Sequence, residues 1–210
     1  MSAGTEKRAY HHGDLRDELM SLAIEEIAEH GTERLSLRSL ARKAEVSQTA
    51  PYRHFPTKTC LLAALATQGF NKLRRSVSDV VNTNAPIEQR FLDMGVAYVT
   101  FALNNRVLYQ LMFGGVIADF SVYQDLRDAS EACYAQVSDC ETQLREAKGL
   151  THDPDRLGGA IWAGVHGVAS LLLNVSPSEH YERDHPRKAV AAMHSDIEDT
   201  MRILFGHLTH

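Results

Sequence analysis

The stretch VSQTAPYRHF, residues 46–55, gathers hydrogen-bonding and aromatic side chains within ten positions. A glutamine can pair with the edge of an adenine through two hydrogen bonds, and a threonine can contact a thymine methyl group. Arginine, tyrosine and histidine side chains can hydrogen-bond to phosphate oxygens. The proline prevents this stretch from forming a long helix. Its polar side chains therefore cannot all be buried with hydrogen-bond partners. We therefore interpret QTAPYRH as a surface that faces a DNA duplex, with Phe55 as an inward anchor.

The preceding residues supply the elements that would position this stretch. Ser36 can cap a short helix over residues 36–44, whose leucines and alanines form one apolar stripe. Glu45 and Val46 then connect it to a second, very short helix that Ser47 can cap. With an earlier amphipathic helix packed across the pair, these elements form a helix-turn-helix. In that motif the second helix lies in the DNA major groove and presents its N-terminal residues to base edges.

The charge distribution favours the same interpretation. The chain as a whole carries a formal net charge of −5, so it is not a polycation that would coat nucleic acid or an anionic membrane. Between residues 34 and 58, however, six basic residues accompany one acidic residue, which gives a local net charge of +5. A polyanion would be attracted to this part of the surface first.

Apolar residues recur at helical spacing along most of the chain, and strand patterns are almost absent. Thr57 can cap a long helix, Asp153 followed by Pro154 can open another, and Pro186 can open the last one. A break near residues 84–86 separates the short first helices from the longer later ones. The count is about nine helices, so we predict an all-α fold.

Composition and motifs also limit the class of protein. The three cysteines are sparse and odd in number, which favours a reducing compartment over a disulfide framework. The N-terminus lacks the apolar core of a secretory signal, so we expect a cytoplasmic protein. The histidines show no zinc-binding spacing, and no oxyanion or phosphate loop accompanies the cysteines. We predict no enzyme activity, no metal and no cofactor.

Residues 157–175 form a run of 19 residues without a formal charge. This length is close to the minimum for a membrane span. We favour a covered helix without membrane insertion, in the middle of the protein or in a subunit interface, because the segment is rich in glycine and contains polar side chains. Gly159, Ala163 and Gly167 recur every four residues and form a smooth strip that a second helix can approach. Together with the apolar stripe of residues 186–208, this strip predicts a two-fold homodimer.

Several motifs together resemble those of a known family. The run YHHGDLR, an EHG turn and LSLRSLARKAEVSQTAPYRHFPTKTCLLAALA are similar to the DNA-binding domain of the TetR family of transcriptional regulators, over about residues 10–70. The later run IWAGVHGVASLL resembles a subgroup with a Trp-x-x-x-His-Gly signature. The resemblance implies a flexible arm over residues 1–9, a three-helix helix-turn-helix domain over 10–70, and a larger helical ligand-binding and dimerisation domain over 71–210.

The resemblance also assigns roles to single residues. Gln48 and Thr49 would open the recognition helix, while Tyr52, His54 and Lys58 match phosphate-contacting positions. The full set of expected DNA contacts is Arg38, Ser47, Gln48, Thr49, Tyr52, Arg53, His54 and Lys58. Glu45 is a departure, because the family usually has glycine in this turn. If that position requires a positive φ, the glutamate costs on the order of 1 kcal/mol.

The resemblance implies a homodimeric repressor that binds a pseudo-palindromic DNA operator and leaves it when a small hydrophobic or amphipathic effector binds. The expected effector-binding residues are Tyr98, Phe101, Tyr109, Met112, Phe113, Trp162 and His166, although the same side chains are also suited to a core. For His166 three interpretations stay open: a hydrogen-bonded core histidine, a contact in the dimer interface, or a polar group of the ligand pocket.

Two other classes remain as alternatives. One is a helical small-molecule-binding protein or enzyme with a non-functional DNA motif, which would bind a ligand without any effect on DNA. The other is a membrane-tethered regulator, which would fractionate with membranes.

Overall fold

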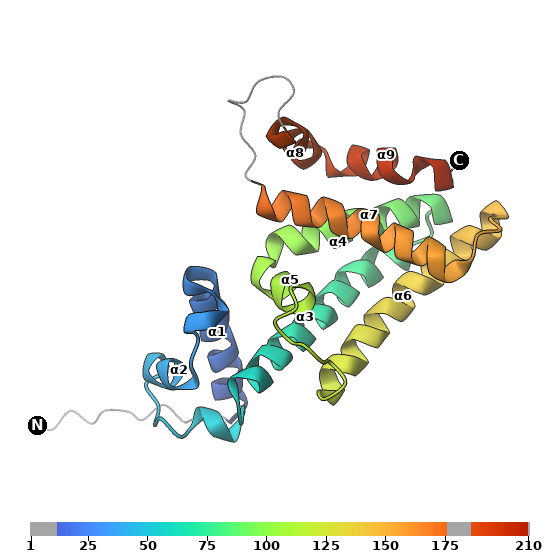
Figure 1. The fold of residues 1–210 in the computed structure, drawn as a ribbon. Helices are drawn as coiled ribbons and strands as arrows, with labels where there is room; N and C mark the ends of the chain where they lie inside the picture. The colour runs from blue at the N-terminus through green and yellow to red at the C-terminus, as the bar shows by residue number, and fades with distance from the viewer. Residues whose placement is uncertain (1–11, 176–185, 210) are drawn as a thin grey trace, which may run out of the picture.

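The structure is a computed structural model, and it describes residues 12–175 and 186–209. Within these residues the chain forms nine α-helices and one short 3₁₀ helix and has no strand, which confirms the predicted all-α fold (Figure 1). The elements are α1 (His12–Arg34), α2 (Leu37–Lys43), η1 (Pro51–Arg53), α3 (Lys58–Val81), α4 (Ile87–Asn104), α5 (Arg106–Phe113), α6 (Gln124–Lys148), α7 (Pro154–Asn174), α8 (Pro186–Ser195) and α9 (Ile197–Thr209).

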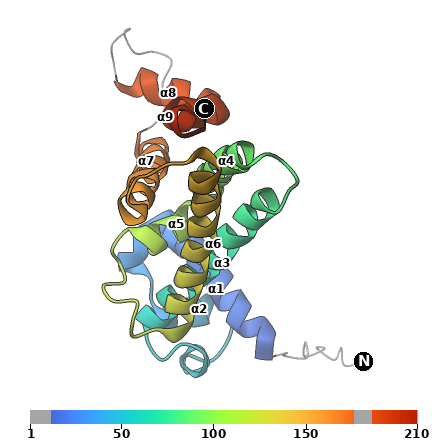
Figure 2. The same cartoon turned by 90° about the vertical axis from the view of Figure 1, so that its right-hand side faces the viewer.

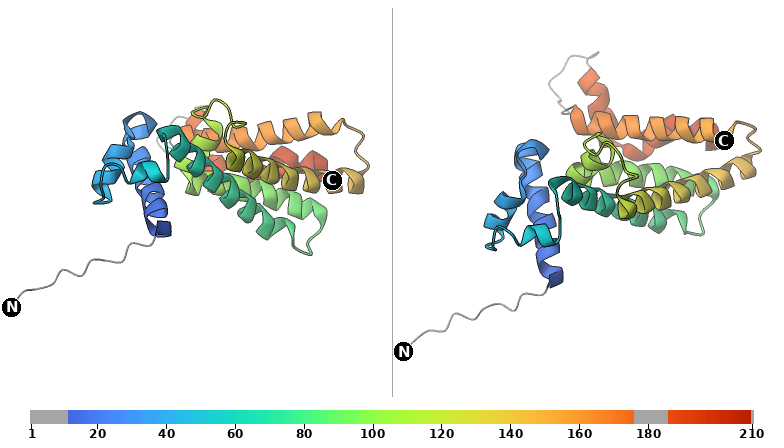
Figure 3. Two further views of the ribbon diagram at one scale, coloured as in Figure 1. Left: turned by 90° about the horizontal axis from the view of Figure 1, so that it is seen from below. Right: turned by 60° about the horizontal axis from the view of Figure 1, so that its bottom comes forward.

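The helices form a small N-terminal unit and a larger bundle, joined by α3. Helices α1 and α2 lie at one end, and α3 runs from them into the bundle, where α6 lies beside it (Figure 1). Helix α7 packs on α4, and α8 and α9 cover the far side (Figure 2). Figure 3 shows the small unit at the end of the bundle from two further directions. Because α3 continues through residue 70, the predicted boundary between residues 70 and 71 lies inside a helix.

Three predicted helix caps are present. The side chains of Ser36, Thr57 and Asp153 each accept a hydrogen bond from the backbone N–H three residues later, at 3.0, 3.1 and 3.0 Å. Each cap satisfies one of the N–H groups that a helix leaves free in its first turn. Pro154 stands in the first turn of α7, as predicted. The beginnings of α2, α3 and α7 are therefore encoded locally.

Two predicted helices differ in the structure. The stretch after Ser47 is a turn followed by the 3₁₀ helix η1 and forms no α-helix, and Pro51, which was expected on the DNA-facing surface, is buried. The carbonyl of Pro51 accepts hydrogen bonds from the backbone of His54 and Phe55, which closes the chain tightly around the proline. The helix predicted over residues 186–208 is divided into α8 and α9, because the Asp196 side chain accepts from the backbone N–H of Asp199 at 2.8 Å and starts a new helix.

The turn of the helix-turn-helix contains a strained residue. Glu45 has φ = 54°, the only positive φ outside glycine among the described residues. Left-handed backbone costs a residue with a Cβ atom roughly 1–2 kcal/mol, because Cβ approaches the following carbonyl. The position therefore has the positive φ at which a glutamate is less favourable than glycine.

We expect Glu45→Gly to raise the free energy of unfolding by about 0.5–1 kcal/mol, since glycine removes the strain but is more flexible in the unfolded chain. Urea unfolding at fixed protein concentration measures the change. Glu131→Gly, at an exposed position in α6, is the matched control and should destabilise by about 1 kcal/mol. Equal destabilisation by both substitutions would show that Glu45 is not strained.

Candidate nucleic-acid interface and ligand cavity

The recognition segment, residues 47–55, is held against the N-terminal core by two inward side chains. Phe55 is only 2% exposed, and Pro51, four residues earlier, is also buried. The guanidinium group of Arg16 in α1 lies 5.3 Å from the centre of the Phe55 ring, in cation–π geometry. The expected role of Phe55 as an anchor is confirmed by this burial. The anchor leaves the intervening polar side chains outside.

The expected DNA-contacting residues lie at or near the surface of α2, the recognition segment and the start of α3. Arg38, Ser47, Gln48, Thr49, Tyr52 and Arg53 are exposed, whereas His54 and Lys58 are partly buried. Ser47 does not cap a helix; its hydroxyl lies 3.2 Å from that of Thr49. The Nζ atom of Lys58 donates to the backbone carbonyl of Glu33 at 3.3 Å, which ties the start of α3 to the end of α1.

One of the basic residues in this region is already neutralised. Lys43 at the end of α2 forms an ion pair with Glu26 of α1, and this pair lowers the pKa of Glu26. It holds α2 on α1, so Lys43 contributes to the scaffold of the motif more than to its free positive charge. The other basic residues between 34 and 58 form no ion pair within the described part of the chain.

Helix α7 has an open face. Only a third of its most apolar 18-residue window is buried, and it is the one helix in the described ranges that is long and apolar enough to cross a membrane. A Cβ atom added at Gly159 or Gly167 would meet nothing within 4 Å, and Ala163 between them is exposed. In α9, Ile203 is 78% exposed. Helix α7 is therefore not covered on every side within the described part of the protomer, in contrast to a helix in the middle of the protein.

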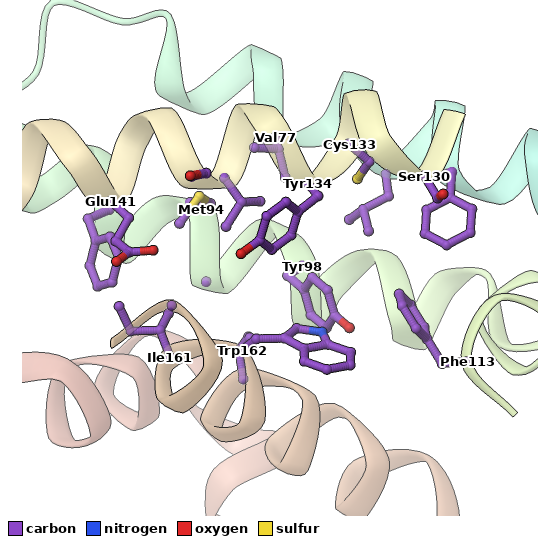
Figure 4. A pocket seen from close by; sticks show the side chains of 18 of the residues that line it. Val77, Met94, Tyr98, Phe113, Ser130, Cys133, Tyr134, Glu141, Ile161 and Trp162 are labelled. Atoms are coloured by element: carbon purple, nitrogen blue, oxygen red, sulfur yellow. The ribbon is translucent and has the colours of Figure 1, made fainter. Parts of the chain in front are cut away.

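A cavity of about 210 Å³ lies between α3, α4, α6 and α7 (Figure 4). Its walls are almost entirely apolar and rich in aromatic rings. The lining residues are Phe70, Leu73, Val77, Phe91, Met94, Gly95, Tyr98, Phe113, Ser130, Cys133, Tyr134, Val137, Ser138, Glu141, Gly158, Ile161, Trp162, Val165 and Phe205. Such a space, enclosed by helices and mostly apolar, is typical of a small-molecule site.

The cavity contains some of the expected effector-binding residues and not others. Tyr98, Phe113 and Trp162 line it. Phe101 is buried on another side of α4, and Met112 packs its sulfur against Gly69 of α3. Neither side chain reaches the cavity, because α4 and α5 bury residues toward more than one neighbour.

Tyr109 and His166 form a hydrogen-bonded cluster beside the cavity. The Nδ1 atom of His166 lies 2.7 Å from the Tyr109 hydroxyl and 3.2 Å from the Tyr98 hydroxyl. Burial lowers the pKa of His166, so the imidazole is neutral at neutral pH, and its Nδ1 can accept from Tyr109. His166 also lines a separate cavity of about 110 Å³ next to Tyr109. It is thus a partnered, half-buried histidine adjacent to the larger cavity.

One carboxylate lines the larger cavity, and we did not predict it from the sequence. Glu141 of α6 is 7% exposed, and burial raises the pKa of its carboxyl group. Its position follows Cys133 and Val137 at intervals of four residues, so helical spacing already placed it on the buried stripe of α6. Within the described ranges, no group of three histidine, cysteine or acidic residues is arranged to hold a metal ion.

Comparison with known families decides the identity of the fold. Residues 19–65 match the model described as bacterial regulatory proteins of the tetR family, and residues 91–196 match a tetracyclin repressor-like C-terminal domain. The chain belongs to the TetR family. The resemblance identified from the sequence is confirmed, and the Trp-x-x-x-His-Gly subgroup remains a prediction.

Individual proteins also resemble this chain in sequence or in fold. A protein of unknown function from Rhodococcus sp. RHA1 is 31% identical, with a TM-score of 0.72 over 91% of this chain and 97% of that one. A tetR-family regulatory protein from Rhodococcus RHA1 shares the fold at 20% identity, with a TM-score of 0.62 over 90% and 96% of the two chains. Nucleoid occlusion factor SlmA of Enterobacter sp. (strain 638) is 25% identical over 74% of this chain and 80% of its own length.

Membership in the TetR family makes the chain a DNA-binding transcriptional regulator with an N-terminal helix-turn-helix domain and a C-terminal regulatory domain. Two of the relatives named above are described by their roles, one as a regulatory protein of the tetR family and one as a nucleoid occlusion factor. The recognition segment lies in the N-terminal domain match, and most of the residues that line the apolar cavity lie in the C-terminal one.

Proposed function

We propose that the protein is a homodimeric repressor that leaves its operator when a small ligand with an apolar body occupies the cavity between α3, α4, α6 and α7. The observation that carries this proposal is the course of α3. Its first turn follows the recognition segment directly, and Phe70, Leu73 and Val77 farther along the same helix line the cavity. A ligand that displaces α3 would therefore displace the recognition segment as well.

Repression and release require the ligand to bind the DNA-incompetent arrangement more tightly, because equal affinity for both arrangements shifts nothing. Dimerisation is expected through the open faces of α7 and α9, whose exposed apolar groups include Leu171 and Ile203. The dimer sets two recognition segments toward one duplex, so the operator should be a pseudo-palindrome. We place the protein in the cytoplasm, where it has access to the chromosome.

Selection from random duplex DNA tests the first half of the proposal. We expect a two-fold symmetric site whose half-site centres lie about 34–36 Å apart, or somewhat farther. A thermal-shift screen of metabolites should then yield compounds that raise the melting temperature and release the selected DNA. An enriched site without two-fold symmetry, or ligands that stabilise the protein without any effect on DNA, would contradict the proposal and favour the carrier or enzyme alternative.

A further inference from the structure

The larger cavity contains a carboxylate that no other group in the described part of the protein neutralises by direct contact. Glu141 is 7% exposed, yet none of the hydrogen bonds or ion pairs found within residues 12–175 and 186–209 ends on its side chain. Figure 4 shows its oxygens directed into the space between α6 and α7, at the end of the pocket opposite Phe113 and Ser130. The carboxylate thus lines the cavity without a direct partner from the protein, which points to a positively charged partner that arrives with the ligand.

The packing around Glu141 leaves its carboxylate room to face the cavity. A Cβ atom added at Gly158 of α7 would lie 2.7 Å from Oε2 of Glu141, so the missing side chain is what lets the carboxylate rest on this turn of α7. Arg145 on α6 and Asp155 on α7 act on Glu141 through space, with opposite signs. The side chains that α3, α4, α5 and α9 contribute to the lining carry no charge at neutral pH, so this end of the cavity remains negative.

The rest of the lining is suited to a positively charged aromatic molecule. Aromatic rings from α3 to α7 and α9 surround the space, and the faces of such rings attract cations as well as apolar groups. Tyr134 of α6 and Trp162 of α7 are 60% and 50% exposed although both line the cavity, so they form its rim. An apolar cavity of roughly 150 Å³ can hold a benzene molecule. The volume of about 210 Å³ here therefore accommodates one ring and a small head group.

We propose that the effector of this regulator is a compact amphipathic organic cation, whose ring lies among the aromatic side chains and whose positive charge lies against the Glu141 carboxylate. This inference rests on the proposed function, in which a ligand in the cavity controls DNA binding. It adds the charge and the size of that ligand.

A matched pair of probes tests the charge requirement. Benzyltrimethylammonium and neopentylbenzene have the same shape and differ by a quaternary nitrogen in place of a carbon. Trp162 is the only tryptophan of the chain and stands at the rim, so its fluorescence reports entry of either probe. We expect the wild-type protein to bind the cation at least about tenfold more tightly than the neutral probe.

Two variants separate the role of Glu141 from that of general negative charge. Glu141→Gln keeps the shape of the side chain and should abolish the preference for the cation while leaving affinity for neopentylbenzene equal or higher. Glu146→Gln removes a charge from an exposed position on the same helix and should behave as the wild type. A cation preference that persists in Glu141→Gln, or a wild-type protein that prefers neopentylbenzene or binds neither probe, overturns the proposal.

The pH dependence provides a second readout, because the charge of benzyltrimethylammonium is fixed. Burial raises the pKa of Glu141, and protonation removes the charge that the cation needs. Affinity for the cation should therefore fall as pH is lowered through this raised pKa, and it should change less with pH in Glu141→Gln. An identical pH dependence in both proteins contradicts the inference.

The outcomes also distinguish this inference from the proposed function. If the cation binds through Glu141 but DNA stays bound, the cavity is assigned correctly and ligand release of the operator is wrong. If only neutral ligands bind, and they release DNA, the regulator is confirmed and the cationic effector is wrong.

Discussion

Ala163→Glu is expected to make the protein monomeric at micromolar concentration and to lower its affinity for the selected operator by at least about 100-fold. Ala163 lies between Gly159 and Gly167 on the open face of α7, where a Cβ atom added at either glycine would meet no atom of the described residues within 4 Å. A charge placed there would be buried without a partner when two copies of α7 pack together. A dimer binds the second half-site from a high effective concentration, and a monomer loses that advantage.

Light scattering measures the oligomeric state, and a gel shift measures binding to the full palindrome and to a single half-site. Ala132→Glu, the same change at an exposed alanine of α6, is the control and should leave both properties unchanged. Affinity for an isolated half-site should be similar in all three proteins. A monomeric Ala163→Glu protein that binds the full palindrome as tightly as the wild type would refute the role of α7 in assembly.

Local features of the sequence predicted the helix boundaries well. A cap such as Ser36, Thr57 or Asp153 depends on a side chain and a backbone group three residues away, so it can be recognised without tertiary information. Where the backbone departs from regular helical geometry, the spacing of apolar residues predicted the boundaries less well. The 3₁₀ turn at Pro51 and the division at Asp196 depend on specific hydrogen bonds that periodicity does not encode.

The candidate cavity was only partly predictable, because an apolar stripe indicates that a residue is buried but not against which neighbour. Tyr98 and Phe101 are both buried, but on different sides of α4, and only Tyr98 lines the larger cavity. Glu141 was overlooked because a charged residue in a helix is usually solvated. Its spacing from Cys133 and Val137 carried the signal, and the neighbouring α7 had to be placed before that signal could be interpreted.

Gln48→Ala is expected to abolish discrimination at one base pair of each half-site. Gln48 is exposed at the beginning of the recognition segment, while Phe55 and Pro51 fix the backbone from inside. A bidentate contact of glutamine with adenine discriminates against the wrong base by roughly 1–3 kcal/mol. Because the dimer makes the contact twice, the full operator should lose about 2–6 kcal/mol of discrimination, which corresponds to a factor of thirty or more.

Competition between the selected operator and versions with one base pair changed symmetrically in both half-sites measures this loss. Lys58→Ala is the matched comparison, since Lys58 stands at the N-terminus of α3, where a phosphate is favoured. It should weaken binding to every sequence alike and reduce the slope of log affinity against log salt by about two, one unit for each protomer. Base-selective loss in Gln48→Ala combined with uniform, salt-dependent loss in Lys58→Ala would separate sequence reading from backbone positioning within one motif. If Gln48→Ala retains full discrimination at every base pair, the recognition segment does not read DNA through this residue, and Arg38, Thr49 or Arg53 must carry the specificity instead.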